Sequence, residues 1–143
     1  MDRSTNQFDA IAEELAGLLQ WDAEELKAYT FLLSKVGEVA REEMMVARGL
    51  TEGELEDVIR RMEEHGLIVR GRSGFYPVHP RLGVSNVYRL SVLSKPSVRY
   101  SRAKVDALMG ILGAHRDRLE ETRPYLGQSG RGRSEAPSSP AKD

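Results

Sequence analysis

Six arginines stand in or beside a predicted β-hairpin and the helix that precedes it. They are Arg48, Arg60, Arg61, Arg70, Arg72 and Arg81. Guanidinium groups bind phosphate oxygens through paired hydrogen bonds, and such contacts give affinity for nucleic acid with little sequence information. Arg70 and Arg72 flank Gly71, so a hairpin at this place could clamp phosphates or enter a minor groove. These residues predict double-stranded DNA as a partner; the alternative is that they form an ordinary solvated surface.

Residues that could support catalysis or metal binding are scattered along the chain. His65, His79 and His115 do not have metal-ligand spacing, and the chain has no cysteine. We find no phosphate-binding loop, no dinucleotide-binding glycine motif and no nucleophile elbow. The sequence therefore predicts that the protein is not an enzyme and has no metal or other cofactor. No small-molecule effector is evident either.

The charge of the chain is divided unevenly between its two halves. Residues 1–66 hold seven Lys and Arg against sixteen Asp and Glu, a net charge of −9. Residues 67–143 hold fourteen against six, a net charge of +8. A polyanionic partner is therefore expected to meet the second half.

Four helices are predicted before the hairpin, over residues 6–19, 22–36, 40–48 and 51–65. Thr51 with Glu54 and Asp22 with Glu25 have the spacing of capping boxes, and glycines 37, 49 and 66 follow the expected helix ends. Residues 67–70 and 75–78 alternate as strands around a Gly-rich turn, and Pro77 indicates an edge strand. The predicted fold is mostly α with a small β-hairpin: a winged helix-turn-helix followed by a long C-terminal helix.

The long helix is predicted from Ser101 to Arg123. Its seam, spaced three and four residues apart, indicates a coiled coil between two copies of the chain. The seam runs through Val105, Leu108, Leu112, His115, Leu119, Thr122 and Leu126, of which the first five are the predicted interface residues. The sequence thus predicts a homodimer through this helix. The alternative is that the helix packs on its own domain.

The expected organisation has four parts: an N-terminal helix (1–20), the winged helix-turn-helix domain (21–80), a connecting segment with the dimerisation helix (81–126), and a disordered tail (127–143). Residues 82–93 fit neither a helix nor a strand clearly. No apolar run is long enough to span a membrane, and the N-terminus lacks the layout of a secretory signal. We therefore expect a cytoplasmic protein with no membrane partner.

Two stretches of the sequence resemble the TrmB-type archaeal transcription regulators. Residues 14–33 are similar to the opening of that family, and residues 58–68 are similar to its recognition helix running into the wing. The resemblance covers about Leu15 to Val78. It implies DNA binding and dimerisation, and often a C-terminal sugar-binding domain. Only one long helix and a tail follow here, so sugar sensing is not carried over.

The start of the predicted recognition helix departs from a typical DNA-reading surface. Glu52, Glu54, Glu56 and Asp57 stand where small, polar or basic residues usually face base edges. Carboxylates suit the positive end of the helix dipole but repel phosphate. Two functions therefore remain open: a dimeric DNA-binding transcriptional regulator, or a winged-helix module that binds a protein of the transcription machinery without touching DNA.

Overall fold

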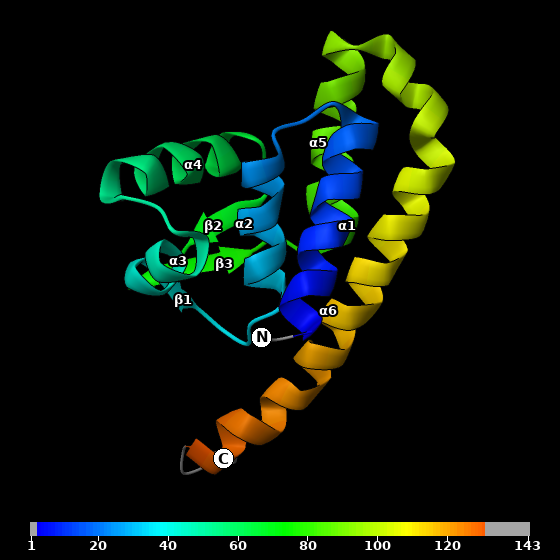
Figure 1. Ribbon diagram of the computed structural model, residues 1–143. Coiled ribbons are helices and arrows are strands. Elements are labelled where there is room, and N and C mark those ends of the chain that lie inside the picture. The colour runs from blue at the N-terminus through cyan, green and yellow to red at the C-terminus, as the bar shows by residue number, and fades with distance from the viewer. Residues whose placement is uncertain (1–2, 131–143) are drawn as a thin grey trace, which may run out of the picture.

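The computed structural model describes residues 3–130, and the side chains of residues 7–121. The chain is mostly helical, with one small antiparallel sheet, as the sequence predicted. The elements are α1 (Arg3–Leu19), α2 (Ala23–Leu33), β1 (Val39–Ala40), α3 (Arg41–Arg48), α4 (Glu52–Glu64), β2 (Ile68–Arg70), β3 (Gly74–Pro77), α5 (Pro80–Ser94), the 3₁₀ helix η1 (Pro96–Ser101) and α6 (Arg102–Gly130). Figure 1 shows α2 between the sheet with α3 and α4 on one side and α1, α5 and α6 on the other.

Helix α2 lies at the centre of the core. Tyr29 is fully buried, and its hydroxyl donates a hydrogen bond of 2.6 Å to the carbonyl oxygen of Val78. Burial raises the pKa of Tyr29, so the hydroxyl keeps its proton and remains a donor. A Cβ at Gly83 of α5 would lie 2.6 Å from this hydroxyl oxygen, so the close approach of α5 to α2 requires glycine at position 83.

The predicted starts of α2 and α4 are confirmed, with one difference. Thr51 and Glu54 form the complete capping box of α4. Asp22 caps α2 by accepting from the backbone N–H of Glu25, but the Glu25 carboxylate does not complete the box. It is buried and contacts Nδ1 of His65 at 2.6 Å instead. The Glu25 carboxylate thus contacts His65, which is distant in the sequence, in place of the nearby backbone N–H of Asp22.

Helix α2 ends earlier than the sequence predicted. Its last residue is Leu33, and Gly37, with φ of +81°, lies in the following loop. The end of the helix is bound by Arg116 of α6, whose Nη1 donates hydrogen bonds to the carbonyl oxygens of Leu33 (3.2 Å) and Lys35 (2.7 Å). A cation at a helix C-terminus satisfies carbonyl groups that have no partner within the helix.

The sheet has a third strand that the sequence did not reveal. The two residues of β1 pair with β3, so the strand order is β1-β3-β2 and the predicted hairpin is confirmed as β2 and β3. Strand β3 is therefore central, and the interpretation of Pro77 as a mark of an edge strand is wrong. Pro77 pairs with Ile68 of β2 and lies beyond the two residues that face β1, Gly74 and Phe75.

The segment that fitted neither helix nor strand is helix α5. His79 is its N-cap and Pro80 its first residue, a position where the missing N–H of proline costs no hydrogen bond. Helix α6 continues past its predicted end at Arg123 to Gly130, so residues 127–130 of the predicted tail are helical. The rest of that tail, 131–143, lies outside the described residues.

One continuous core joins the parts that the sequence separated at residues 20 and 80. It contains residues of α1, α2, α4, α5 and α6, from Phe8 to Leu112. Val105 and Leu112 of the predicted dimer seam are buried in this core, whereas Leu108, His115 and Leu119 are half-buried. The seam of α6 thus faces its own domain, against α1 and α5. Val105 and Leu112 do not form an open surface for a second copy, contrary to the sequence prediction.

We expect Arg116→Met to destabilise the fold by roughly 1.5–3 kcal/mol, because it removes charged hydrogen bonds to two carbonyl groups. Arg116 is only 4% exposed, so water cannot easily replace it. Urea unfolding followed by circular dichroism measures the change. Arg118→Met, on the exposed side of the same helix, is the matched control and should stay within about 0.5 kcal/mol of the wild type. Equal stability of both variants would contradict the role of Arg116.

His115 should make the fold sensitive to mild acid. Burial beside Phe8, together with the charges of Arg118 and Arg116, lowers its pKa from the usual 6.5. As the pH falls below about 6.5, the unfolded chain takes up the proton first, so the free energy of unfolding decreases. Unfolding of His115→Leu at pH 7.5 and pH 5.5 should show a smaller loss of stability than the wild type. An equal loss in both proteins would contradict this prediction.

Candidate nucleic-acid interface

Helices α3 and α4 are joined by a tight turn, residues 49–51. Gly49 has φ of +65°, which glycine adopts without strain, and Thr51 caps the start of α4. Helix α4 buries one face, formed by Leu55, Val58, Ile59 and Met62, and turns the other outward. The outward face of α4 is therefore open to solvent.

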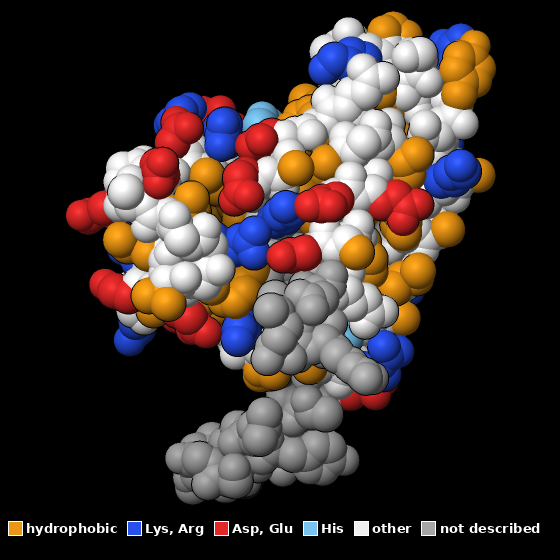
Figure 2. All heavy atoms as spheres, in the orientation of Figure 1, with side chains coloured by type: hydrophobic (Ala, Val, Ile, Leu, Met, Phe, Trp, Pro, Cys, Tyr) orange, Lys and Arg blue, Asp and Glu red, His pale blue; other side chains and the backbone are white. Residues whose placement is uncertain are grey.

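That outward face is acidic. The thirteen residues of α4 include six carboxylates and two arginines. Glu52, Glu54, Glu56 and Asp57, which the sequence marked as unusual, are all exposed. In the space-filling view, acidic side chains surround the part of the molecule formed by α3 and α4, with basic side chains set among them (Figure 2).

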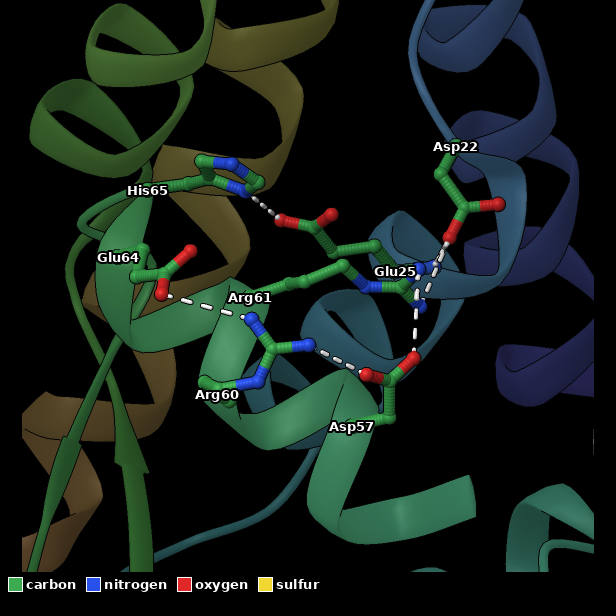
Figure 3. A network of polar contacts seen from close by, with 7 residues as sticks. All are labelled: Asp22, Glu25, Asp57, Arg60, Arg61, Glu64 and His65. Atoms are coloured by element: carbon green, nitrogen blue, oxygen red, sulfur yellow. Dashed lines mark hydrogen bonds and ion pairs between the residues drawn. The ribbon is translucent and has the colours of Figure 1, made fainter.

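The two arginines of α4 are both engaged by carboxylates (Figure 3). Arg60 pairs with Asp57 on one side and Glu64 on the other. The hydrogen bond to the Asp57 carboxylate raises the pKa of Arg60. Arg61 reaches Asp22, at the start of α2, with an N–O distance of 3.3 Å, and Asp57 at 3.7 Å. Both guanidinium groups therefore have carboxylate partners within the domain.

The arginines of α3 are engaged in the same way. Arg48 is mostly buried and lies 3.4 Å from a carboxylate oxygen of Asp9 and 3.9 Å from one of Glu24. It ties α3 to α1 and α2 and is not available to a large ligand. Arg41, which the sequence analysis did not single out, pairs with Glu52 and Glu56 of α4.

The hairpin of β2 and β3, which we call the wing, carries two arginines in different states. Arg70 is paired through its Nε with Glu63 of α4 at 2.7 Å, and its guanidinium lies 5.6 Å from the ring centre of Phe75. Arg72 lies at the exposed tip of the wing, and no carboxylate pairs with it among the described residues. Arg81, at the start of α5, is mostly exposed and only 3.8 Å from Asp117. Of the six predicted arginines, Arg72 is the freest.

The tip of the wing is held in place by Glu38, a residue that the sequence analysis missed. One oxygen of its carboxylate accepts hydrogen bonds from the backbone N–H groups of Ser73 (2.6 Å) and Gly74. Its other oxygen accepts from the hydroxyl of Tyr76 at 3.4 Å. Glu38 precedes β1 directly, so the strand that was not predicted brings the carboxylate to the wing. This contact orients the backbone that directly follows Arg72.

A buried carboxylate lies behind α4. Glu25 of α2 contacts His65, whose ring packs edge-on against Trp21 with ring centres 4.7 Å apart. Figure 3 shows this pair beside the arginine network, bridging α2 and the end of α4. The pair fixes the C-terminal end of α4, and with it the place where the wing begins.

His79 and His115 also have places in the fold. His79 caps α5 through Nδ1 and contacts Asp117 through Nε2 at 2.8 Å. In the part of the chain that the structure describes, no three His, Cys, Asp or Glu side chains are placed to hold a metal ion. Within the same range, no helix has the length and apolarity required to cross a membrane.

Comparisons with protein-family models, with curated proteins and with solved structures give no match to this chain. Its function is therefore argued from its own residues.

We expect Glu38→Ala to loosen the tip of the wing without unfolding the domain. The backbone N–H groups of Ser73 and Gly74 would lose a charged acceptor, so their amide hydrogen exchange should accelerate about tenfold or more. Exchange measured by NMR tests this. Glu42→Ala, which removes an exposed carboxylate four residues further along the chain, is the control and should leave both amides unchanged. Unchanged exchange in Glu38→Ala would show that the contact does not hold the tip.

Proposed function

We propose that this protein is a winged helix-turn-helix protein that binds double-stranded DNA and regulates transcription, with the wing as its main DNA contact. The observation that carries the proposal is the state of Arg72. Its guanidinium is exposed and unpaired among the described residues, at the tip of a hairpin whose backbone Glu38 holds. A free guanidinium on an ordered hairpin tip suits a phosphate group or a minor groove.

The arrangement of the elements supports the winged-helix assignment. Helices α3 and α4 are joined by three residues that include a glycine, a connection of the length typical of a helix-turn-helix. The hairpin follows α4 directly, and β1 attaches it to the start of α3.

Helix α4 should contribute little to DNA affinity. Its exposed carboxylates would approach the negatively charged backbone of DNA, and its arginines already have carboxylate partners. If these arginines left their carboxylates to bind phosphate, one anionic partner would replace another. The net gain in binding free energy would therefore be small. We therefore propose that the protein positions itself on DNA mainly through phosphate contacts, which carry little sequence information.

A second function is favoured by the same acidic surface. The outward face of α4 could dock a basic segment of another protein, and the wing would then have no role in nucleic-acid binding. Charge complementarity between an acidic face and a basic partner would give such a complex its specificity. Binding to duplex DNA separates the two proposals.

We expect Arg72→Ala to lower the affinity for mixed-sequence duplex DNA and to reduce the salt slope of binding by about one unit per bound chain. A phosphate group that loses its contact with the protein keeps its counterion. Fewer ions are then released on binding, so the salt slope is smaller. Fluorescence anisotropy across a salt series measures both quantities. The loss should be similar for unrelated DNA sequences.

The matched control for this experiment is Arg60→Ala, which removes an exposed but paired arginine from α4. It should leave the salt slope unchanged. If Arg60→Ala lowers the slope and Arg72→Ala does not, α4 rather than the wing meets DNA. If no duplex binding appears even at low salt, the protein-docking function replaces the proposal.

A further inference from the structure

The end of the molecule at which α5, η1 and α6 meet is rich in positive charge. Residues 89–104, which we call the basic end, include five Lys and Arg and no Asp or Glu. The five cations, all exposed, are Arg89, Lys95, Arg99, Arg102 and Lys104. Figure 1 shows this end projecting beyond α1 and α4, and in Figure 2 basic and apolar side chains gather there while acidic ones lie over other elements.

Most of this charge is not neutralised within the chain. Arg89 contacts the neutral amide of Asn86 at 2.9 Å, and Lys95 contacts the carbonyl oxygen of Gln20 at 3.3 Å. Arg99 lies against the ring of Tyr100, 5.2 Å from its centre. Together with Lys104, these cations have no carboxylate partner among the described residues, whereas Arg102 pairs with Asp106. The basic end therefore keeps the charge that the arginines of α3 and α4 lose to their acidic partners.

Large apolar side chains are exposed among these cations. Leu93 of α5 is 80% exposed and Tyr100 of η1 is 79% exposed. Leu90, one turn before Leu93 on the same side of the helix, is 38% exposed. A surface that combines free cations with exposed leucine and tyrosine is suited to a partner with anionic groups outside and apolar groups beneath them. The headgroup layer of a lipid bilayer has this order.

Buried residues hold the basic end in place from its inner side. Val98 of η1 and Val105 of α6 are each 1% exposed. The hydroxyl of Ser91, also buried, donates a hydrogen bond to the carbonyl oxygen of Leu19 at the end of α1. The exposed side chains are thus presented by an ordered turn, so a partner that binds them does not have to order the backbone first.

We propose that the basic end binds the surface of a membrane that contains anionic lipids. Leu93 and Tyr100 enter the boundary between headgroups and acyl chains, and the four unpaired cations lie among the charged headgroups. Clusters of about four to eight Lys and Arg on an amphipathic helix are typical of proteins that bind such lipids.

A contact of this kind needs no helix that crosses the bilayer, and none is found among the described residues. The sequence analysis expected no membrane partner because it considered only spanning segments and secretory signals. The inference does not depend on DNA binding by the wing, so its test is separate from the test of the proposed function.

Duplex DNA is the other polyanion that these cations could attract. Its phosphate backbone would use the charges and leave Leu93 in water. An anionic bilayer uses both the charges and the leucine. The dependence of binding on Leu93 therefore separates the two partners.

The experiment measures co-sedimentation of the full-length protein with vesicles of phosphatidylcholine, alone or with about one third phosphatidylserine. We expect the wild type to bind the phosphatidylserine vesicles at least tenfold more strongly. Arg99→Gln combined with Lys104→Gln should weaken this binding about tenfold or more, since each cation near an anionic surface contributes about fivefold. Leu93→Ser should weaken it at least fivefold, because the inserted apolar group is lost.

Two variants at other exposed positions are the matched controls. Arg118→Gln removes an exposed cation of α6 that lies outside the basic end, and Val46→Ser removes an 84% exposed apolar residue of α3. Both should bind the vesicles as the wild type does. Equal loss of binding in the controls would show that the basic end is not the contact.

Equal binding of the wild type to both kinds of vesicle, or to neither, would overturn the proposal. A Leu93→Ser variant that binds as the wild type does would overturn the insertion of apolar side chains. The combined Arg99 and Lys104 variant should keep the wild-type affinity for duplex DNA. If it instead loses DNA affinity while the wild type does not bind the vesicles, nucleic acid replaces the membrane as the partner of the basic end.

Discussion

Pairing of the arginines around α4 with carboxylates is the interaction on which this account depends. All four arginines of α3 and α4 have acidic partners, which come from α1, α2 and α4 itself. The pairs attach α3 and α4 to the rest of the domain, and they also neutralise the charges that such helices would otherwise present to DNA. On this ground we propose that the outward face of α4 is a weak phosphate-binding surface. The free positive charge of this region is therefore left at the tip of the wing, on Arg72.

The wing and α6 show how distant residues complete the fold. Glu38 holds the wing tip from before β1, and Arg116 of α6 binds the end of α2 from more than eighty positions away in the sequence. Both are charged groups that satisfy backbone groups at the end of an element, where the element itself cannot. Arg116 and the buried Val105 and Leu112 together fix α6 to its own domain.

Much of the fold could be predicted from local patterns, and the site could not. Thr51 with Glu54, Gly49 and the alternation of residues 67–78 specify α4, its turn and the hairpin through neighbours in the sequence. The differences from the sequence prediction involve contacts between residues distant in the sequence. The Glu25 carboxylate contacts His65 instead of completing its capping box, and α2 ends where Arg116 binds the following carbonyl groups. The three-four spacing of α6 was identified correctly as an apolar stripe, but the spacing does not say whether a stripe meets its own domain or another chain. The arginines of the candidate site can be identified in the sequence. Their ion pairs cannot, because the carboxylate partners lie up to 39 residues away along the chain.

The most direct test of the central claim is an NMR titration of the ¹⁵N-labelled protein with a short mixed-sequence DNA duplex at low salt. The account predicts that backbone amide shifts concentrate on residues 71–76 of the wing. Residues 52–57, at the acidic start of α4, should change little. Large shifts at 52–57 with an unaffected wing would contradict the claim that carboxylate pairing removes α4 from DNA contact and leaves the wing to make it.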